Sequence, residues 1–325
     1  ERQNLNLLRP LCILLTGWSG LDWLLSWLGG DVEGHILFLD LLVQLLRCTL
    51  LRALFHRKIV LVGSIGTVFF VLIALFAPLV APYDPNVIDK GAYLLGMSPL
   101  HPLGTDLYGR DLFSRLVFGA RVSLLTGVTA TLIAAAAGSL LGIVAAYYGG
   151  IVDKILLRAC ETLDAIPYIA LTMALVAILG NGMLNMAVIM CSTCVPFFVR
   201  MMRASVLSIL NSDYILAAKL SGQSEWKLWL KHILPNSVSP IIVSATQNVG
   251  NTIMMESGLS FLGIGISVPM ASWGAIISEA RPYLTTHPLY VLAPCACLAA
   301  LIICLNLFGD GIRDALDPSL RGETA

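Results

Sequence analysis

Long apolar runs alternate with short polar segments along the chain, and the runs predict six helices that cross a membrane. Such a helix needs about 20 mostly apolar residues. The second run is rich in Ala and Gly, which let neighbouring helices approach closely. The pattern therefore predicts an all-α, polytopic membrane bundle. The predicted spans are Ile59 to Ala81, Val122 to Tyr148, Ile166 to Leu179, Leu184 to Val199, Ser237 to Phe261 and Leu289 to Phe308.

The composition also indicates a membrane protein. Of the 325 residues, 57% are hydrophobic and 12% are charged, with a mean hydropathy of +0.84, whereas a soluble domain carries about 25% charged residues. The formal net charge is zero, so no overall positive field points to nucleic acid. We expect membrane lipid around the protein and no nucleic-acid partner.

The first 55 residues are harder to assign. The runs Leu5 to Leu28 and Ile36 to Leu46 are apolar but contain charged residues, and a charge at bilayer depth costs a few kcal/mol on insertion scales. We predict an N-terminal extension of interfacial helices over residues 1–55, and an additional membrane hairpin stays open. The sequence shows no small-residue cleavage site, so we expect no removable signal peptide.

Lys and Arg are distributed unevenly between the polar segments. If there are six spans, most basic residues fall on one side, which the positive-inside rule makes cytoplasmic. The start of the first span and the C-terminus are then cytoplasmic. The residues on that side are Arg47, Arg52, Arg57, Lys58, Lys154, Arg158, Arg200, Arg203, Lys219, Lys227, Lys231, Arg313 and Arg321.

A polar segment, "DYILAAKLSGQSEWKLWLKHILPN", lies between the fourth and fifth predicted spans. Asp213 is placed to cap one short helix and Ser224 a second, with Gly222 in the turn between them. Pro235 is expected to end the second helix as the fifth span begins. The pattern predicts a cytoplasmic helical hairpin near residues 213–232. Two readings stay open: a partner-docking element, or a solvated loop whose tryptophans lie at the membrane surface.

Polar residues within the fifth predicted span form a second candidate site. Gln247, Asn248 and Asn251 fall within about one turn of one another, and Glu256 follows. Polar groups inside a membrane usually face the interior of a bundle or a water-filled path. We predict that these four residues line a translocation path, the alternative being hydrogen bonds to a neighbouring helix.

On the opposite side, the segment from Tyr83 to Gly119 is rich in Gly, Pro and Asp. Its charged residues either pair among themselves or form a docking surface for another protein, together with the loop that contains Glu279. His101 has no evident partner set, so we predict no metal site. The candidate docking residues are Asp106, Arg110, Asp111, Arg115, Trp273 and Arg281.

Motifs for catalysis and cofactor binding are missing from the sequence. It contains no GxxxxGK[ST] phosphate loop, no HExxH and no GxSxG. The pairs Cys191/Cys194 and Cys295/Cys297 lie in apolar runs without nearby His or carboxylate, so we interpret them as packing residues. We predict no catalytic residues, no metal and no cofactor bound by this chain.

Several segments resemble the permeases of ATP-binding cassette (ABC) importers. "AAKLSGQSEWKLWLKHILPN" is similar to the coupling helix of these permeases, and three further segments match the dipeptide, oligopeptide and nickel branch in the expected order. They are "HPLGTDLYGRDLFSRLVFGARVSL", "LSFLGIGISVPMASWGAIISEAR" and "NLFGDGIRDALDPSLRG". The resemblance covers about residues 54–322, with a first helix and outer loop over residues 56–120 and a permease domain over residues 121–322.

The resemblance implies the second permease subunit of such an importer, in a bacterial inner membrane. Its implied partners are a homologous permease subunit, one or two ATPase subunits that carry ATP and Mg, and an extracytoplasmic substrate-binding protein. Leu216 departs from the family pattern, which has an acidic residue there. The implied ATPase-docking residues are Tyr214, Leu216, Ala217, Ala218, Gly222, Trp226, His232 and Pro235.

Other functions remain as alternatives at this stage. The same architecture is compatible with a nickel chelate, another metal chelate or a glutathione-like solute as cargo. A self-sufficient secondary transporter or channel would show internal repeats, broken helices or charged relay residues. A membrane-embedded enzyme would need a nucleophile with its base or clustered metal ligands, and the sequence favours neither of these two classes.

Overall fold

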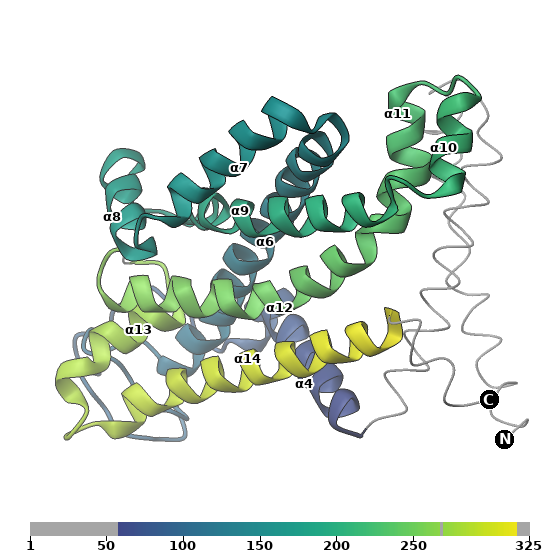
Figure 1. Ribbon diagram of the computed structural model, residues 1–325. Helices are drawn as coiled ribbons and strands as arrows, with labels where there is room; N and C mark the ends of the chain where they lie inside the picture. Colours follow the sequence, from purple (N-terminus) through teal and green to yellow (C-terminus); the bar gives the residue numbers. More distant parts are fainter. Residues whose placement is uncertain (1–57, 267–268, 317–325) are drawn as a thin grey trace, which may run out of the picture. The chain divides into compact units, whose positions relative to one another are not determined.

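The computed structural model describes residues 58–316 except Ser267 and Val268, so the predicted N-terminal extension over residues 1–55 lies outside the described residues. Within the described part, the only β-type pairing is an isolated antiparallel bridge between Thr105 and Asp111, and all named elements are helical (Figure 1). They are α4 (Lys58–Leu75), α5 (Ala77–Val80), α6 (Leu112–Tyr148), α7 (Gly150–Asp164), α8 (Tyr168–Leu179), α9 (Met183–Ile209), α10 (Asp213–Leu220), α11 (Glu225–Leu228), the π-helical turn η1 (Trp229–Ile233), α12 (Leu234–Phe261), α13 (Trp273–Ala280), the 3-10 turn η2 (Arg281–Tyr283) and α14 (Pro288–Leu316).

Four of the described helices, α4, α6, α9 and α14, are long and apolar enough to cross a membrane. The helix α12 has 28 residues, but its Gln, Asn, Ser and Thr side chains make it more polar than these four. The helix α8 has 12 residues, which is about 18 Å at 1.5 Å per residue and too short to cross alone. It forms one arm of a pair with α7, bent by 92°.

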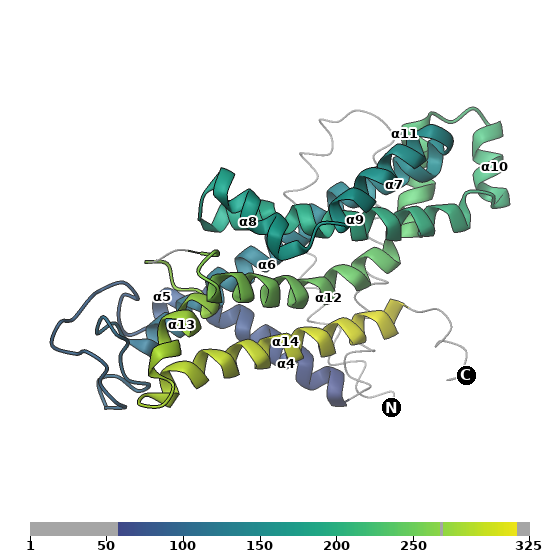
Figure 2. The same cartoon turned by 60° about the vertical axis from the view of Figure 1, so that its left-hand side comes forward.

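The long helix α6 packs against most of the other helices. It lies along α9 and also contacts α4 and α12, while α12 contacts α14 and α14 contacts α4 (Figures 1 and 2). A Cβ on Gly138 or Gly142 would lie 2.5 Å from the Phe198 Cβ or 2.7 Å from the Val199 carbonyl oxygen, respectively. The prediction that Ala and Gly in this span allow close helix contact is therefore confirmed.

Two helices are longer than their predicted spans, and in α9 a partner on α7 neutralises a charged residue of the extension. The prediction starts one span at Val122, but α6 begins at Leu112, so the predicted domain boundary after residue 120 falls inside a continuous helix. The prediction ends another span at Val199, but α9 continues to Ile209. Arg203 on α9 donates two hydrogen bonds to Asp153 on α7, of 2.5 and 2.6 Å.

Segments that the sequence assigns to one side of the membrane also lie together in the structure. A Cβ on Gly311 near the end of α14 would meet Val60 near the start of α4. At the other end of the bundle, Arg110 and Arg115 contact Glu279 on α13. The relative placement of these polar segments therefore agrees with the predicted topology.

Candidate functional site

The predicted hairpin is present as α10, a turn and α11, followed by the π-helical turn η1. Figure 1 shows α10 and α11 side by side, beyond the ends of α9 and α12. Gly222 in the turn has φ +74°, a backbone conformation that a residue with a Cβ resists. Ser224 occupies the predicted N-cap position of α11, but its side chain makes no capping hydrogen bond. The N-cap of α10 is Ser212 and not Asp213, which is the first helical residue.

Pro235 does not end a helix, contrary to the prediction. It is the second residue of α12, which follows η1 directly. The helix reaches Pro235 without a break, because in η1 the Leu234 N–H bonds to the Trp229 carbonyl, five residues earlier. Half-buried His232 lies in this π-helical turn. The hairpin is thus joined rigidly to α12 by continuous helix.

The hairpin has an inner and an outer face. Ile215, Ala218 and Leu228 are buried against α6 and α9. Of the two alanines in the implied docking set, Ala217 is exposed and Ala218 is buried, because neighbouring residues on a helix point about 100° apart. The exposed residues of the predicted docking set are Tyr214, Leu216, Ala217, Gly222 and Trp226.

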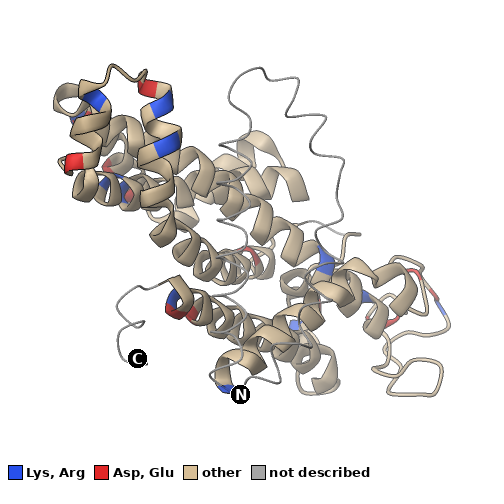
Figure 3. Cartoon of the chain, turned by 90° about the vertical axis from the view of Figure 1, so that its right-hand side faces the viewer, with Lys and Arg blue, Asp and Glu red and all other residues tan. Residues whose placement is uncertain are grey.

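Large apolar side chains on the outer face lie among charged ones. Leu220 is 89% exposed, Trp226 64% and Leu230 57%. Figure 3 shows basic and acidic residues along the two helices of the hairpin; these charged residues include Asp213, Lys219, Glu225 and Lys227. A purely lipid-facing surface would lack these charges, and a purely solvated loop would lack the apolar side chains. The outer face has the mixed character of a protein-binding surface.

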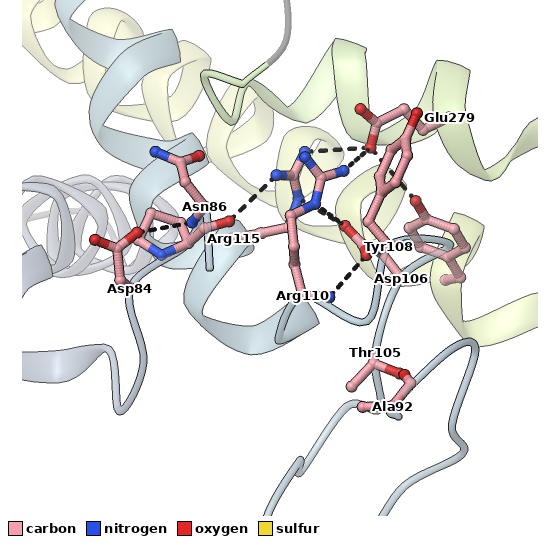
Figure 4. Close-up of polar contacts among 11 residues, drawn as sticks. Asp84, Asn86, Ala92, Thr105, Asp106, Tyr108, Arg110, Arg115 and Glu279 are labelled. Atoms are coloured by element: carbon pink, nitrogen blue, oxygen red, sulfur yellow. Dashed lines mark hydrogen bonds and ion pairs between the residues drawn. The ribbon is translucent and has the colours of Figure 1, made fainter. Parts of the chain in front are cut away.

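The predicted outer docking residues form a buried ion-pair network instead (Figure 4). Arg110 Nε donates to Asp106 Oδ2 at 2.5 Å, and its terminal nitrogen donates to Glu279 Oε2 at 2.7 Å. Arg115 donates to the same Glu279 oxygen at 3.2 Å and to the Pro85 carbonyl at 3.3 Å. The side chains of Asp106, Arg110 and Arg115 are at most 2% exposed. These residues therefore pair among themselves and are not available on the surface.

Asp111 and His101 form a second, partly buried contact beside this network. Asp111 caps α6, since its Oδ2 accepts from the Ser114 N–H at 2.8 Å and from the Ser114 hydroxyl at 2.7 Å. Its other oxygen is 2.9 Å from His101 Nδ1, a contact that the sequence analysis did not anticipate. Sequence spacing gave no sign of it, because the two residues meet only when the loop folds back.

We expect Asp111→Ala to lower the free energy of unfolding by about 1–2 kcal/mol. The change removes an N-cap and leaves buried polar groups on His101 and Ser114 without their acceptor. Chemical unfolding of the purified protein in detergent micelles measures the effect. Asp84→Ala is the control, since Asp84 accepts only an exposed loop bond from the Asn86 N–H. Equal stability of the two variants would contradict the capping role.

Trp273 is also not a surface residue. It is 1% exposed, its Nε1 donates to the Leu116 carbonyl at 2.9 Å, and its ring meets Phe70 edge-on at 6.0 Å. From the sequence, Trp273 was expected on the outer surface. Gly119 on α6 has no side chain, and the Trp273 ring fills the space beside it. Among the predicted outer docking residues, only Arg281 is exposed, over the ring of Phe261.

Polar residues of the fifth predicted span point in different directions. Glu256 is fully buried, with hydrogen bonds from Ser260 at 2.7 Å and from Ser123 and Ser257 at 3.4 Å each. Its carboxylate is thus held inside the subunit and does not face a path in this conformation. Ser260 lies four residues after Glu256 on α12, and Ser123 lies on α6. The sequence shows the first spacing, but only the fold brings Ser123 to the carboxylate.

The three amide residues lie nearer the surface. Gln247 donates to Asp310 on α14 at 3.2 Å, and Asn248 donates to the Ser244 carbonyl of its own helix at 3.0 Å. Asn251 is exposed. The alternative of a hydrogen bond to a neighbouring helix therefore holds for Gln247, and the lining of a translocation path stays a prediction.

Comparison with known proteins identifies the family. Residues 138–322 match the model of the binding-protein-dependent transport system inner membrane component, which is more than half of the chain. The chain belongs to this family. It is therefore a membrane permease of a transport system. Residues 49–99 also match the N-terminal transmembrane domain of oligopeptide transport permease C.

Curated relatives cover most of the chain. It is 40% identical over 261 residues to the probable D,D-dipeptide transport system permease protein DdpC of Escherichia coli, covering 80% of this chain and 88% of the relative. It is 39% identical to the dipeptide transport system permease protein DppC of Alkalihalophilus pseudofirmus (83% and 89% covered). It is 37% identical to the glutathione transport system permease protein GsiD of Pectobacterium atrosepticum (83% and 90% covered).

Solved structures show a related fold. The permease matches an inward-facing structure of the MetNI methionine ABC transporter with a TM-score of 0.52 and 19% identity, covering 62% of this chain and 96% of that chain. A second crystal form of MetNI gives a TM-score of 0.53 at 18% identity, covering 63% and 98%. At this identity, the likeness concerns the fold.

Proposed function

We propose that this permease forms half of a heterodimeric translocation path in an ATP-driven importer of dipeptides and short oligopeptides, and that an ATPase subunit docks on the α10–α11 hairpin. The observation that carries the proposal is the outer face of the hairpin, where Leu220, Trp226 and Leu230 are exposed among charged residues outside the spans. A protein partner buries such side chains and leaves the charges at the rim.

The hairpin is well placed to receive force. It follows α9 directly and continues into α12 through η1, and it packs inward through Ile215, Ala218 and Leu228. A displacement of the docked partner would therefore move two long helices together. The sequence lacks a phosphate-binding loop, so hydrolysis is assigned to the partner with its ATP and Mg.

The substrate class comes from the curated relatives. Two of those described are dipeptide permeases and one is a glutathione permease, and glutathione is itself a peptide-like solute. Exposed Asn251 on α12 is our candidate for the lining of the path, with a homologous permease subunit opposite. Exposed Arg281 is our candidate for the outer surface that meets a substrate-binding protein.

The proposed membrane is a bacterial inner membrane, with the hairpin, the start of α4 and the end of α14 on the cytoplasmic side. The positive-inside rule supports this orientation, because Lys219, Lys227 and Lys231 belong to the hairpin segment.

Partner recovery tests the proposal. The tagged chain is purified in mild detergent from its native host, and accompanying proteins are identified by mass spectrometry. We expect a second permease and one or two ATPases with the natural protein, and loss of the ATPases with Leu220→Glu, because a carboxylate would have to be buried without a partner. Leu100→Glu is the matched control, since Leu100 is 70% exposed on the outer loop.

Recovery of the natural chain alone, as an active homo-oligomer, would reject the importer-subunit proposal. Retention of the ATPases by Leu220→Glu would reject the hairpin as their docking surface. Uptake of a radiolabelled dipeptide, measured in competition with glutathione, then decides between the two substrate classes.

A further inference from the structure

An aromatic clamp joins the hairpin to the cytoplasmic end of α6. It consists of Tyr147 and Tyr148 at the end of α6 and of Trp226 and Trp229 in the hairpin. The Trp229 ring lies 5.4 Å from the Tyr147 ring and 6.0 Å from the Tyr148 ring, both nearly perpendicular. It also lies 5.5 Å from the Trp226 ring. These distances and angles are those of favourable edge-to-face pairs.

Polar contacts surround the clamp. The Tyr148 hydroxyl donates to Glu225 Oε2 at 2.7 Å, and Lys219 Nζ lies 5.1 Å from the centre of the Tyr147 ring. Glu225 and Lys219 both belong to the hairpin. Tyr147 and Tyr148 at the end of α6 are therefore held by polar contacts as well as by the Trp229 ring. The chain does not connect α6 to the hairpin directly, since α7, α8 and α9 lie between them.

The opposite end of α6 is tied to the outer ion-pair network. Asp111 caps it, Arg115 contacts Glu279 on α13, and the Leu116 carbonyl accepts from Trp273. Between these two ends α6 is one uninterrupted helix of 37 residues, about 55 Å at 1.5 Å per residue. One helix thus reaches from the hairpin to the folded outer loop.

We propose that the aromatic clamp couples the hairpin to α6, so that a displacement of the hairpin is carried along α6 to the outer loop. Tyr147, Tyr148 and Trp229 are then positioning residues of the transport cycle. The inference rests on the proposed function, because it needs an ATPase that moves the hairpin. Coupling through a packed helix requires that its contacts at both ends hold during the movement.

The test measures the outer loop while ATP acts on the cytoplasmic side. Met97 is 72% exposed and lies next to the paired backbone of Leu95 and Thr105. A Met97→Cys variant of the full complex, reconstituted in liposomes, is labelled with a membrane-impermeant maleimide, with and without ATP and vanadate. The chain without this change gives the background from its own cysteines.

We expect ATP and vanadate to change the labelling rate of Cys at position 97 when the clamp is intact. With Tyr147→Leu and Trp229→Leu together, the ratio of the two rates should fall to about one, because sites without coupling do not affect each other. The ATPase subunits should remain bound, since the exposed face of the hairpin is unchanged. Trp229→Phe keeps an edge-to-face partner for both tyrosines and should restore the response.

Phe69→Leu is the matched control, because Phe69 is 57% exposed on α4 and stacks only on its neighbour Phe70. An unchanged rate ratio in the Tyr147/Trp229 double variant would overturn the clamp, as would an outer loop that does not respond to ATP in the parent. Loss of the ATPases from the double variant would also overturn the coupling role, because Tyr147 and Trp229 would then be needed for assembly of the complex. If the natural complex holds no ATPase, the proposed function itself fails, which partner recovery shows separately.

Discussion

Replacement of Arg115 by Met should lower the free energy of unfolding by about 3–5 kcal/mol, the usual effect of removing one partner from a buried ion pair. The Arg115 side chain is fully buried and faces Asp106 and Glu279. Without it, two carboxylates share Arg110 as their remaining cation in the network, and the Pro85 carbonyl loses its donor. Chemical unfolding in detergent micelles measures the loss.

Arg158→Met is the matched control for this prediction. Arg158 pairs with Glu161 on α7, but the two side chains are 83% and 56% exposed, and exposed ion pairs contribute little to stability. The same chemical change should therefore leave the unfolding curve of the control nearly unchanged. If Arg115→Met unfolds at the same denaturant concentration as Arg158→Met, the outer network does not stabilise the loop.

Sequence patterns predicted the fold well where apolar runs are long. The helices α4, α6, α9, α12 and α14 lie where such runs occur, and the positions of Gly222 and Ser224 predicted the hairpin turn. Boundaries were less accurate, because hydropathy ends a span at the first charged residue. Asp164 and Asp153, which lie 36 and 50 positions earlier in the chain, pair with Arg200 and Arg203, so α9 continues past these arginines.

Predictions for single side chains were less successful, since they depend on which face of an element is buried. The prediction placed Trp273 on the surface, but Gly119 on α6 provides a slot for its ring. It placed Glu256 at a path, whereas serines from α6 and α12 surround the carboxylate. Tyr147 and Trp229 meet across 82 residues of sequence, and no local pattern indicates such a contact.

The packing of α6 on α9 gives the second large effect. We expect Gly138→Ala and Gly142→Ala together to destabilise the protein strongly, by about 1–3 kcal/mol for each overpacked site. The added Cβ at Gly142 would lie 2.7 Å from the Val199 carbonyl oxygen and 2.8 Å from the Met202 Cβ. Backbone and Cβ atoms cannot rotate away, so the two helices must separate. Unfolding of the single and double variants in detergent micelles tests this.

Gly258→Ala on α12 separates this steric effect from the general effect of alanine in a helix. No heavy atom lies within 4 Å of a Cβ at Gly258 outside its own local backbone, and alanine is the better helix former by about 1 kcal/mol in water. The control should therefore be as stable as the parent or slightly more stable. A similar gain at Gly142 would show that α6 and α9 are not in close contact in the membrane protein. Separation of these helices would also strain the Arg203–Asp153 pair, which ties α9 to α7, the helix that follows α6 directly. The close approach of α6 and α9 thus fixes the position of α6 between the hairpin and the outer loop.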